Sequence, residues 1–314
     1  MFDILRDTRW ANSACAPIAG DASRRRYFRI GPPDAILMDD PTHSTQRFAD
    51  VANALLAIGL SAPEIHAHNP DSGTMIIADL GQTEFAKHLT HHPSDAAELY
   101  KAATDVLLQI TQRKPALKLY EMTHQVAVEM IDLAALHYAD NAAAKDDIAS
   151  GLRDAFDAYV AHDLHFALRD FHAENLIWRP DRFGLDQVGL LDFQDACFAP
   201  IGYDMMSLIR DARRDVPSAL ADKIMADFCH GIGETQEDLS AHLACVGVQR
   251  NLRILGIFAR LARQENKPQY LALLPRVWRC LMIDLDHPAL GKLRGIVLGA
   301  LPPPDNATLQ RLTP

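Results

Sequence analysis

At 314 residues the chain exceeds one compact core, so its length predicts two lobes or domains with a cleft between them as the default site. Hydrophobic residues at 48% and charged residues at 23% exclude disordered and fibrous proteins. The formal net charge of −10 argues against a general affinity for nucleic acid or for an anionic membrane, because both need a dominating basic surface.

The sequence also predicts the compartment in which the protein works. Its five cysteines are scattered without a C-x-x-C pair, which indicates buried thiols in a reducing compartment rather than disulfides or a zinc cluster. The stretch Met1–Trp10 carries acids and lacks the apolar core of a signal peptide, and no apolar run reaches the roughly 18 residues of a membrane span. We therefore expect a cytoplasmic protein, and separately we expect it to be a monomer with a small-molecule hydroxyl acceptor.

Strand and helix patterns alternate in the first eighty or so residues. Two β-rich runs, YFRI and AILM, are separated by Gly31-Pro32-Pro33 and predict a hairpin. Residues 48–60 then show apolar side chains at helical spacing, and the run TMIIADL predicts a further strand. The predicted order is strands, helix, strand.

Helical patterns dominate from Glu98 onward. Apolar stripes predict helices over 99–110, 148–159, 218–229 and 239–262. Strand-like runs interrupt them between residues 165 and 193, as HFAL, NLIW and QVGLLDF, and a proline-rich tail ends the chain. A small mixed lobe followed by a larger helical lobe with one short β insertion is the layout of a kinase.

Between two of these strand-like runs lies LRDFHAEN, in which Asp170 and Asn175 stand five residues apart. This is the D-x-x-x-x-N spacing of a kinase catalytic loop that follows a strand. The carboxylate would accept the proton of the attacking hydroxyl, and the amide oxygen would bind Mg²⁺, which prefers hard oxygen ligands. We therefore predict Asp170 as catalytic base and Asn175 as metal ligand.

A second metal ligand is expected at Asp192, in LLDFQD at the end of a strand-like run. It stands where the aspartate of a D-F-G motif would stand, with Gln194 in place of the glycine. Taken singly, Asp170 or Asn175 is more often a turn cap. The loop, the hairpin and the D-F pair are specific only together.

The remaining polar residues of the loop have plainer interpretations. His172 has no H-x-H or H-x-x-x-H partner, so a structural histidine that orients the loop is favoured over a metal ligand or a base. Glu174 is interpreted as a solvated or outer group. A two-metal phosphohydrolase centre is the alternative enzyme class, although its spacings fit no ligand pattern. Its residues would be His162, His165, Asp170, His172 and Asp192.

One glycine-containing stretch precedes the first hairpin strand. Gly20-Asp21-Ala22-Ser23 is a candidate loop that covers phosphates with its backbone amides, and the alternative is an ordinary turn. The sequence holds no G-x-x-x-x-G-K-[ST] motif, which excludes a P-loop enzyme. Gly231 follows a helical pattern and is interpreted as its terminator.

Together these segments resemble the aminoglycoside phosphotransferase superfamily, and most closely its kinases that phosphorylate the anomeric hydroxyl of N-acetylmuramate and N-acetylglucosamine. The resemblance implies an α+β, two-lobed protein-kinase-like fold with ATP and Mg²⁺ as cofactors. Residues 1–81 would form the nucleotide-binding lobe that ends in the hinge, and residues 82–314 the helical lobe with the catalytic loop, metal site and acceptor site. The matching segments are GDASRRRYFRI, ILMDDP, GLSAPEIHAH, MIIADLG, LRDFHAENLIW, GLLDFQDACFAPIGYDMMSLIRDAR and QRNLRILGIFARLARQENKPQYLALLPRV.

The resemblance also implies roles for individual residues. Backbone groups of Asp79, Leu80 and Gly81 would meet adenine at the hinge. Asp204 would accept hydrogen bonds from backbone amides of the catalytic loop and so orient the base, although a helix N-cap explains it nearly as well. Cofactor contacts are therefore expected at Gly20, Ser23, Arg29, Asp79, Leu80 and Gly81, and orienting contacts at Asp204 and His172.

Two features depart from the family pattern. Related kinases present a lysine on the third strand, where this chain has Met38, so Arg24, Arg25, Arg26 or Arg29 is expected to supply the charge, with a solvated basic turn as the alternative. The segment YEMTHQVAVEMIDLAALHYAD, residues 120–140, lacks the expected acidic and aromatic pattern. We expect it to help line the acceptor site.

The predicted function is Mg²⁺-dependent transfer of the ATP γ-phosphoryl group to the anomeric hydroxyl of an N-acetylated amino sugar. An arginine should face the lactyl acid of muramate, with Arg210, Arg213 and Arg250 as candidates that solvated helix faces explain equally well. An aminoglycoside or choline kinase is one alternative. A degenerate nucleotide-binding regulator is another, which the missing lysine favours and the intact Asp170, Asn175 and Asp192 set opposes.

Overall fold

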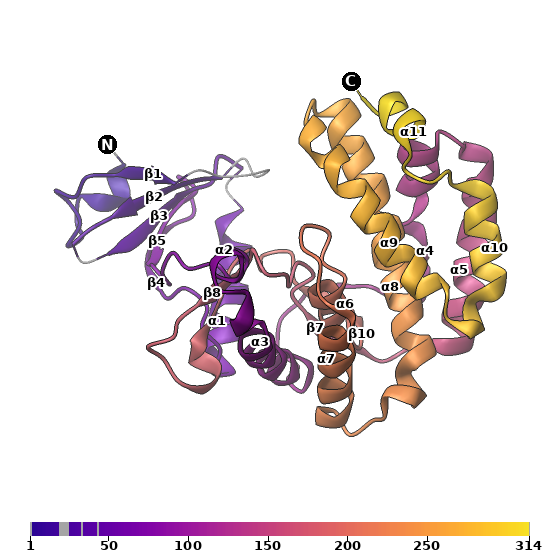
Figure 1. The fold of residues 1–314 in the computed structure, drawn as a ribbon. Coiled ribbons are helices and arrows are strands. Elements are labelled where there is room, and N and C mark those ends of the chain that lie inside the picture. Colours follow the sequence, from indigo (N-terminus) through magenta and orange to yellow (C-terminus); the bar gives the residue numbers. More distant parts are fainter. Residues whose placement is uncertain (1, 19–24, 33, 43, 314) are drawn as a thin grey trace. The chain divides into compact units, whose positions relative to one another are not determined.

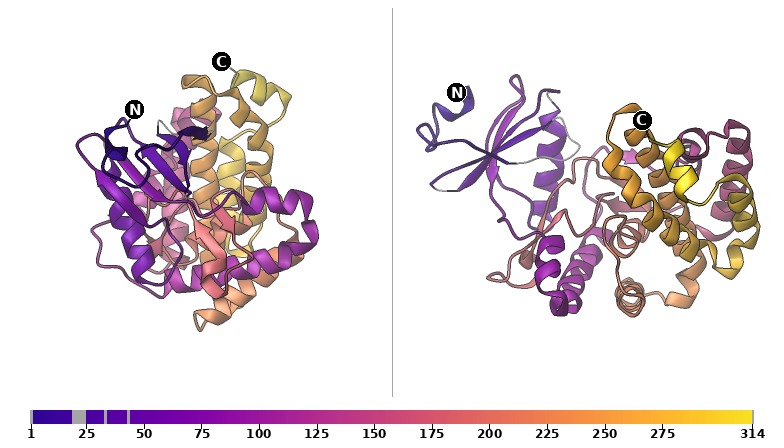
Figure 2. Two further views of the ribbon diagram at one scale, coloured as in Figure 1. Left: turned by 90° about the vertical axis from the view of Figure 1, so that its left-hand side faces the viewer. Right: turned by 45° about the horizontal axis from the view of Figure 1, so that its top comes forward.

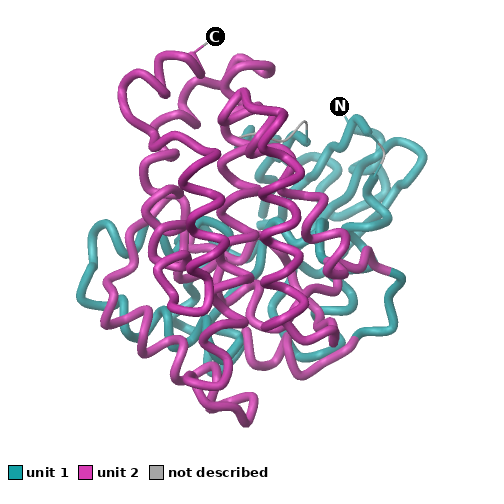
Figure 3. Tube along the Cα trace, turned by 90° about the vertical axis from the view of Figure 1, so that its right-hand side faces the viewer, with its two compact units in different colours: residues 1–106, 115–118, 174–196 teal, residues 107–114, 119–173, 197–314 magenta. Residues whose placement is uncertain are grey.

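The computed structural model describes residues 2–18, 25–32, 34–42 and 44–313, which form two compact units. The first comprises Met1–Val106, Pro115–Lys118 and Glu174–Ala196, and the second comprises Leu107–Lys114, Leu119–Ala173 and Cys197–Pro314 (Figure 3). These units do not follow the boundary expected at residue 81. The first unit also takes in residues 82–106 and the segment that carries Asn175 and Asp192.

A five-stranded antiparallel sheet forms the centre of the first unit, with the strand order β1-β2-β3-β5-β4 (Figure 1). The predicted hairpin is present as the β2–β3 pair, in which Tyr27 lies opposite Met38. The run TMIIADL forms β5, and the stretch 48–60 falls largely in helix α1 (Thr45–Ala57). The strands are β1 (Ala16–Ile18), β2 (Arg26–Ile30), β3 (Ala35–Asp39), β4 (Ile65–Asn69) and β5 (Thr74–Ala78).

Alternation along the strands gives this sheet two different faces. On one face Ile30, Leu37 and Ile76 pack with Leu5 and Trp10 from the N-terminal segment into a buried apolar cluster. The opposite face carries the side chains that alternate with these. They include Tyr27 of β2 and Met38 of β3, which lie opposite each other in the β2–β3 pair. A polar and a charged side chain, Tyr27 and Arg29, therefore lie on the second face, where they are available to a ligand.

The segment that includes Asn175 and Asp192 packs on the first unit through the hairpin of β8 (Leu176–Trp178) and β9 (Val188–Leu190). The Trp178 amide donates to the Thr83 carbonyl at 2.7 Å, and the Leu190 amide donates to the Ser61 carbonyl at 2.8 Å. Gly189 permits this approach, since a Cβ there would lie 3.1 Å from the Leu80 side chain. Helices α2 (Phe85–His91) and α3 (Ala96–Thr111) follow the sheet in the chain.

The second unit is mainly helical and holds a three-stranded sheet of order β6-β10-β7. Helices α5, α7 and α8 agree with the stripes predicted over 148–159, 218–229 and 239–262, whereas the expected tail contains three further helices, α9 to α11. The strands are β6 (Tyr120–Glu121), β7 (Leu164–Ala167) and β10 (Cys197–Pro200). The helices are α4 (His124–Glu129), a π-helix (Ala134–Ala139), α5 (Lys145–Tyr159), α6 (Tyr203–Ile209), α7 (Ser218–Gly231), α8 (Gln236–Gln264), α9 (Leu274–Leu285), α10 (Gly291–Ala300) and α11 (Asn306–Arg311).

Helix α8 is the central element of this unit and runs beside α9 (Figure 2). It also contacts α5, α6 and the π-helix. Because neighbours cover α8 on several sides, its apolar residues do not form a single stripe, and residues such as Leu252 and Leu255 are fully buried. None of the helices in the described ranges has the length and apolar character needed to cross a membrane.

Candidate functional site

A cavity of about 410 Å³ in the first unit brings together many of the predicted site residues. It lies against the sheet face that carries Tyr27, and residues of β8 and of the segments that flank β8 and β9 also line it. Asn175 and Asp192 line it, although 17 residues separate them in the chain. The expected hinge and strand residues that also line it are Arg29, Asp79, Leu80 and Gly81.

The walls of this cavity are largely aliphatic. Ile36 and Ile77 contribute from the sheet, and Ile177 and Leu191 from the β8–β9 segment. Apolar walls of this kind suit an aromatic ring, and the polar groups of the chain at 79–81 lie at the same cavity. Gly81 has a φ of +112°, a backbone conformation that favours glycine.

Arg29 and Asp79 form an ion pair in the wall of the cavity, with 2.6 Å between Arg29 Nε and Asp79 Oδ2. The other carboxylate oxygen of Asp79 accepts the Gly81 amide at 2.9 Å. One carboxylate therefore ties β2 to the hinge residues. This arrangement fixes the path of the chain where adenine contacts are expected.

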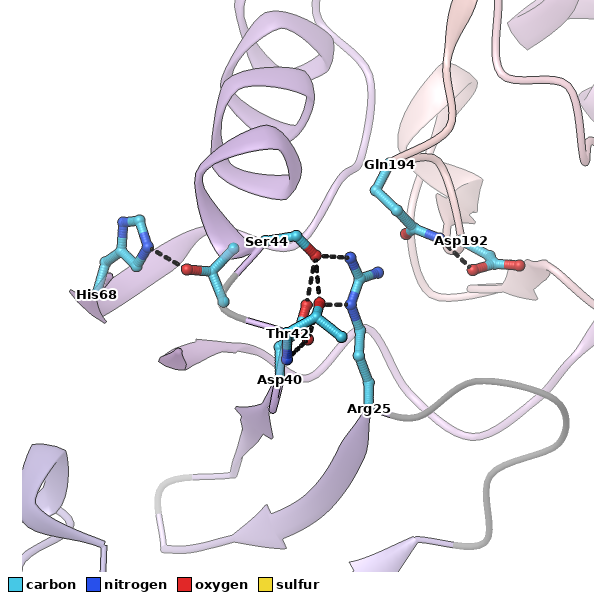
Figure 4. Close-up of polar contacts among 8 residues, drawn as sticks. Arg25, Asp40, Thr42, Ser44, His68, Asp192 and Gln194 are labelled. Carbon is cyan, nitrogen blue, oxygen red and sulfur yellow. Dashed lines mark hydrogen bonds and ion pairs between the residues drawn. The ribbon is translucent and has the colours of Figure 1, made fainter. Parts of the chain in front are cut away.

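Asp192 has a φ of +55°, the left-handed region that non-glycine residues rarely adopt. Gln194, which replaces the glycine of a D-F-G motif, donates from Nε2 to Asp192 Oδ1 at 2.7 Å (Figure 4). Phe193 is buried against Phe48 of α1, with ring centroids 4.8 Å apart. Arg47 of α1 donates to the Gln194 carbonyl at 2.6 Å and so holds the loop that carries Asp192. No sequence motif predicts this contact.

The donors at this end of the cavity fit magnesium. Asp192 offers a carboxylate and Asn175 an amide oxygen, both hard ligands. Mg²⁺ in phosphoryl-transfer sites takes one or two protein ligands and completes its shell with water and phosphate oxygens. In the described part of the chain no group of three or more His, Cys, Asp and Glu side chains is placed to hold a metal ion.

Met38, where the resemblance predicts that the family lysine would stand, is fully buried and carries no charge. Nearby, Arg25 pairs with Asp40 at 2.9 Å, and Asp40 also accepts hydrogen bonds from Thr42 and Ser44 (Figure 4). Burial alone would raise the pKa of Asp40, yet these hydrogen bonds hold it well below its usual range. The expected phosphate loop at Gly20 and Ser23, and the candidate Arg24, lie outside the described residues.

Tyr27 lies between this ion pair and the end of the cavity that carries Asp192. Burial raises the pKa of Tyr27, the Arg25 guanidinium opposes the rise, and the Asp192 carboxylate adds to it. The phenol therefore lies near both charges. Of the candidate arginines described, Arg26 is a poorer choice, because its side chain is 64% exposed and pairs with Asp39.

Asp170, the predicted catalytic base, belongs to the second unit. Asp170 follows β7, and the preceding residue, Arg169, has a φ of +74°. The buried Asp204 carboxylate accepts the Leu168 amide at 2.6 Å and the Arg169 amide at 2.9 Å. This geometry is the one expected of Asp204, and its part in a reaction stays a prediction.

Burial of the Asp204 carboxylate is electrostatically unfavourable. Burial raises its pKa to about 7, and the nearby Asp170 carboxylate adds to the rise, while the two backbone amides oppose it. Backbone N–H donors are the groups that make such a buried carboxylate tolerable. The contact holds the backbone just before Asp170 in a conformation that it would not otherwise prefer.

His172 is buried behind the loop. Burial lowers its pKa to about 4; Asp211 opposes the shift, and Arg213 and Arg250 add to it. The Arg213 guanidinium lies 3.4 Å from His172 Nε2, and the Arg213 amide donates to Asp211 at 2.8 Å. A neutral, buried imidazole agrees with the structural interpretation of His172. Sequence reasoning did not single out Asp211, because only its position in the segment DAR (residues 211–213) pointed to it.

Two of the three candidate substrate arginines are engaged inside the protein. Arg210 pairs with the buried Asp284 at 2.8 Å. Arg250, only 4% exposed, donates to Ser207 Oγ at 2.8 Å and to the Arg210 carbonyl at 3.2 Å. Their guanidinium groups thus satisfy protein acceptors, which favours a structural role. Arg213, beside His172, is the candidate that lies at the loop.

Comparison with known proteins agrees with this picture. Residues 14–240 match the phosphotransferase enzyme family. The chain is 32% identical to the N-acetylmuramate/N-acetylglucosamine kinase of Caulobacter vibrioides, over 88% of this chain and 89% of that protein. A choline/ethanolamine kinase family protein from Mesorhizobium loti superposes with a TM-score of 0.65 at 17% identity, covering 93% and 96% of the two chains. The ADP-bound aminoglycoside phosphotransferase APH(2'')-Ib gives 0.58 at 11% identity, covering 85% and 92%. The fold is therefore the protein-kinase-like fold expected from the sequence.

Proposed function

The chain belongs to the phosphotransferase enzyme family, and we propose that it transfers the γ-phosphoryl group of ATP to the anomeric hydroxyl of an N-acetylated amino sugar. The observation that carries the proposal is the cavity in which Asn175 and Asp192 lie together with the hinge residues Asp79 to Gly81. One wall offers metal ligands and the other suits a nucleobase. The name of the Caulobacter vibrioides relative supports the choice of acceptor.

Asn175 and Asp192 would hold Mg²⁺, which neutralises charge on the phosphate oxygens when it is bound. Asp192 supplies the negative charge, and Gln194 fixes one of its oxygens by a 2.7 Å hydrogen bond. Asn175 is held by the backbone as well, because its carbonyl accepts the Leu191 amide at 3.0 Å. The two ligand-bearing segments are thereby tied to each other before any cation binds.

Asp170 would accept the proton of the attacking hydroxyl. Asp204 orients the loop by holding the amides of Leu168 and Arg169, so the base starts from a fixed backbone. An anomeric hydroxyl is more acidic than an ordinary alcohol because the ring oxygen withdraws electrons. A carboxylate base is therefore adequate for this acceptor.

The test uses purified protein with Mg²⁺ and ATP, and follows ADP release. The acceptors are N-acetylmuramate, N-acetylglucosamine, their methyl glycosides, an aminoglycoside and choline. We expect turnover of the free sugars and none of the methyl glycosides, whose anomeric oxygen is blocked. Equal turnover of both forms, or activity on the aminoglycoside or choline alone, would refute the anomeric amino-sugar assignment.

A further inference from the structure

A second cavity, of about 510 Å³, lies within the helical unit. Helix α8 provides one wall with Arg253, Ile257 and Arg260, which lie on one face of the helix by their spacing. The chain between Glu129 and Leu136, from the end of α4 into the π-helix, provides the other wall. This second wall is part of the segment 120–140, which departs from the family pattern in sequence.

Gly256 determines how closely the two walls approach. A Cβ on Gly256 would lie 2.3 Å from the Leu133 carbonyl carbon and 2.6 Å from the Ala134 amide nitrogen. Backbone therefore packs directly on backbone at this point. Arg253 precedes this contact by one turn and Arg260 follows it by one turn, so both guanidinium groups border the same cavity.

Positive charge in this cavity exceeds the negative charge that could balance it. Across the described ranges, neither Arg253 nor Arg260 forms an ion pair or a side-chain hydrogen bond, and Arg260 Nε is buried without an acceptor. Of the two acids in the wall, Asp132 already pairs with Lys145 at 2.8 Å. Glu129 accepts a hydrogen bond from Gln125 at 2.9 Å and is the remaining carboxylate.

Two half-buried guanidinium groups with unused donors are costly unless an acceptor arrives. A carboxylate fits this need, because its two oxygens match the fork of donors that arginine presents. Apolar side chains of Met130, Leu133 and Ile257 complete the wall. The cavity is therefore suited to a small molecule with one acidic group and an apolar edge.

The cavity also lies near the catalytic loop, within the same unit. Cys197 of β10 pairs with Tyr120 on one side and with Ala167 on the other, so about 10 Å separates the Tyr120 and Ala167 backbones. Asp170 comes three residues after Ala167. Burial raises the pKa of Tyr120, and the charges that act on it include Arg169 of the loop and Arg253 of the cavity. Arg169 of the loop and Arg253 of the cavity therefore both lie near the Tyr120 side chain.

We propose that Arg253 and Arg260 receive the carboxylate of an acidic acceptor sugar, and that this cavity distinguishes a lactyl-substituted amino sugar from its neutral counterpart. The inference rests on the proposed amino-sugar kinase function. It replaces the arginines expected from the sequence with two others on α8. Arg250, one turn earlier on the same helix, donates a hydrogen bond to Ser207 Oγ. Arg253 instead lines the cavity.

The experiment compares N-acetylmuramate with N-acetylglucosamine in the wild-type enzyme and in Arg253→Gln. Loss of a charged hydrogen-bond pair should raise KM for N-acetylmuramate about 10- to 100-fold, leaving KM for N-acetylglucosamine and both kcat values within about twofold. Arg260→Gln should act in the same direction. Arg253→Lys should keep part of the preference, because it retains the charge but loses the fork.

Arg263→Gln is the matched control. It removes the same charge from the same helix, but Arg263 pairs with Asp140 at 3.0 Å and does not line the cavity. Equal losses for both sugars in Arg253→Gln, or the same selective loss in Arg263→Gln, would overturn the inference. Thermal unfolding of each variant separates these outcomes from a folding defect.

A binding measurement keeps this inference separate from the proposed function. If the wild-type protein phosphorylates neither sugar, the amino-sugar kinase proposal fails, and calorimetric binding of N-acetylmuramate then decides the carboxylate site. Binding that weakens in Arg253→Gln supports the site. Equal binding to both proteins, or no binding to the wild type, overturns it.

Discussion

Arg25 and Asp40 form an ion pair at the end of the β2–β3 hairpin, with 2.9 Å between Arg25 Nε and Asp40 Oδ2. Both side chains are largely buried, at 11% and 1% exposure, and Ser44 donates to the same carboxylate oxygen at 2.8 Å. Figure 4 shows Arg25 and Asp192 on neighbouring segments of this unit. A fixed guanidinium thus lies near the end of the cavity that carries Asp192, where Met38 offers no charge.

We therefore predict that Arg25 performs the phosphate contact of the missing lysine. Arg25→Gln should weaken binding of ADP about 10- to 100-fold and leave binding of adenosine unchanged, since adenosine carries no phosphate. Arg26→Gln is the control, because the neighbouring guanidinium is 64% exposed and lies on the alternate side of the strand. Calorimetry with the two ligands checks this. An equal loss for adenosine would indicate a structural role for Arg25.

Asp170 should be required for turnover but not for nucleotide binding. Asp170→Asn should lower kcat by roughly 10²- to 10⁴-fold, the usual size of a general-base contribution, with little change in the Kd for ADP. Asp163→Asn, an exposed position before β7, provides the matched control. A rate unchanged by Asp170→Asn would remove this residue from the mechanism.

Asp192 and Asn175 should differ in their effect on magnesium. Asp192→Ala should weaken binding of Mg-ADP more than Asn175→Ala, because it deletes a negative charge beside the cation, and metal-free ADP binding should change less in both. Asp181→Ala, 79% exposed in the β8–β9 turn, is the control. Titrations with and without Mg²⁺ measure the difference. Full Mg-ADP affinity in both variants would contradict the ligand assignment.

His172 should make the folded protein less stable in acid. Burial lowers its pKa from 6.5 to about 4, so between these values the unfolded chain binds a proton that the folded chain does not. The stability contributed by the neutral imidazole is complete above pH 6.5 and is lost as the pH falls to 4, by up to about 3 kcal/mol.

The variant His172→Gln lacks this titration. The difference in unfolding free energy between wild type and His172→Gln should therefore shrink as the pH falls from 6.5 to 4. Urea unfolding at several pH values measures it, with His230→Gln, exposed on α7, as control. A constant difference across this range would show that His172 titrates normally in the folded state.

The sequence by itself determined many of the elements and the order along the chain of the residues proposed to carry the chemistry. The β2–β3 hairpin, α1, α5, α7 and α8 follow from local patterns of apolar residues and turns, which act over a few residues and need no tertiary information. The spacing of Asp170 and Asn175 and the D-F pair at Asp192 were equally visible. These motifs indicated a phosphotransferase because each is a short, continuous piece of chain.

Only the tertiary structure decided which charges remain available. Arg210, Arg213 and Arg250 were plausible anion receptors in the sequence, yet Arg210 is neutralised by Asp284, which comes 74 residues later. Arg253 and Arg260 gave no signal, because a helix periodicity cannot show whether an arginine meets an acid from another element. The close backbone approach at Gly256 likewise depends on residues 133–134, far away in the chain. Pairing and burial are long-range properties, so they separated the arginines that hold the fold from those left to hold a ligand.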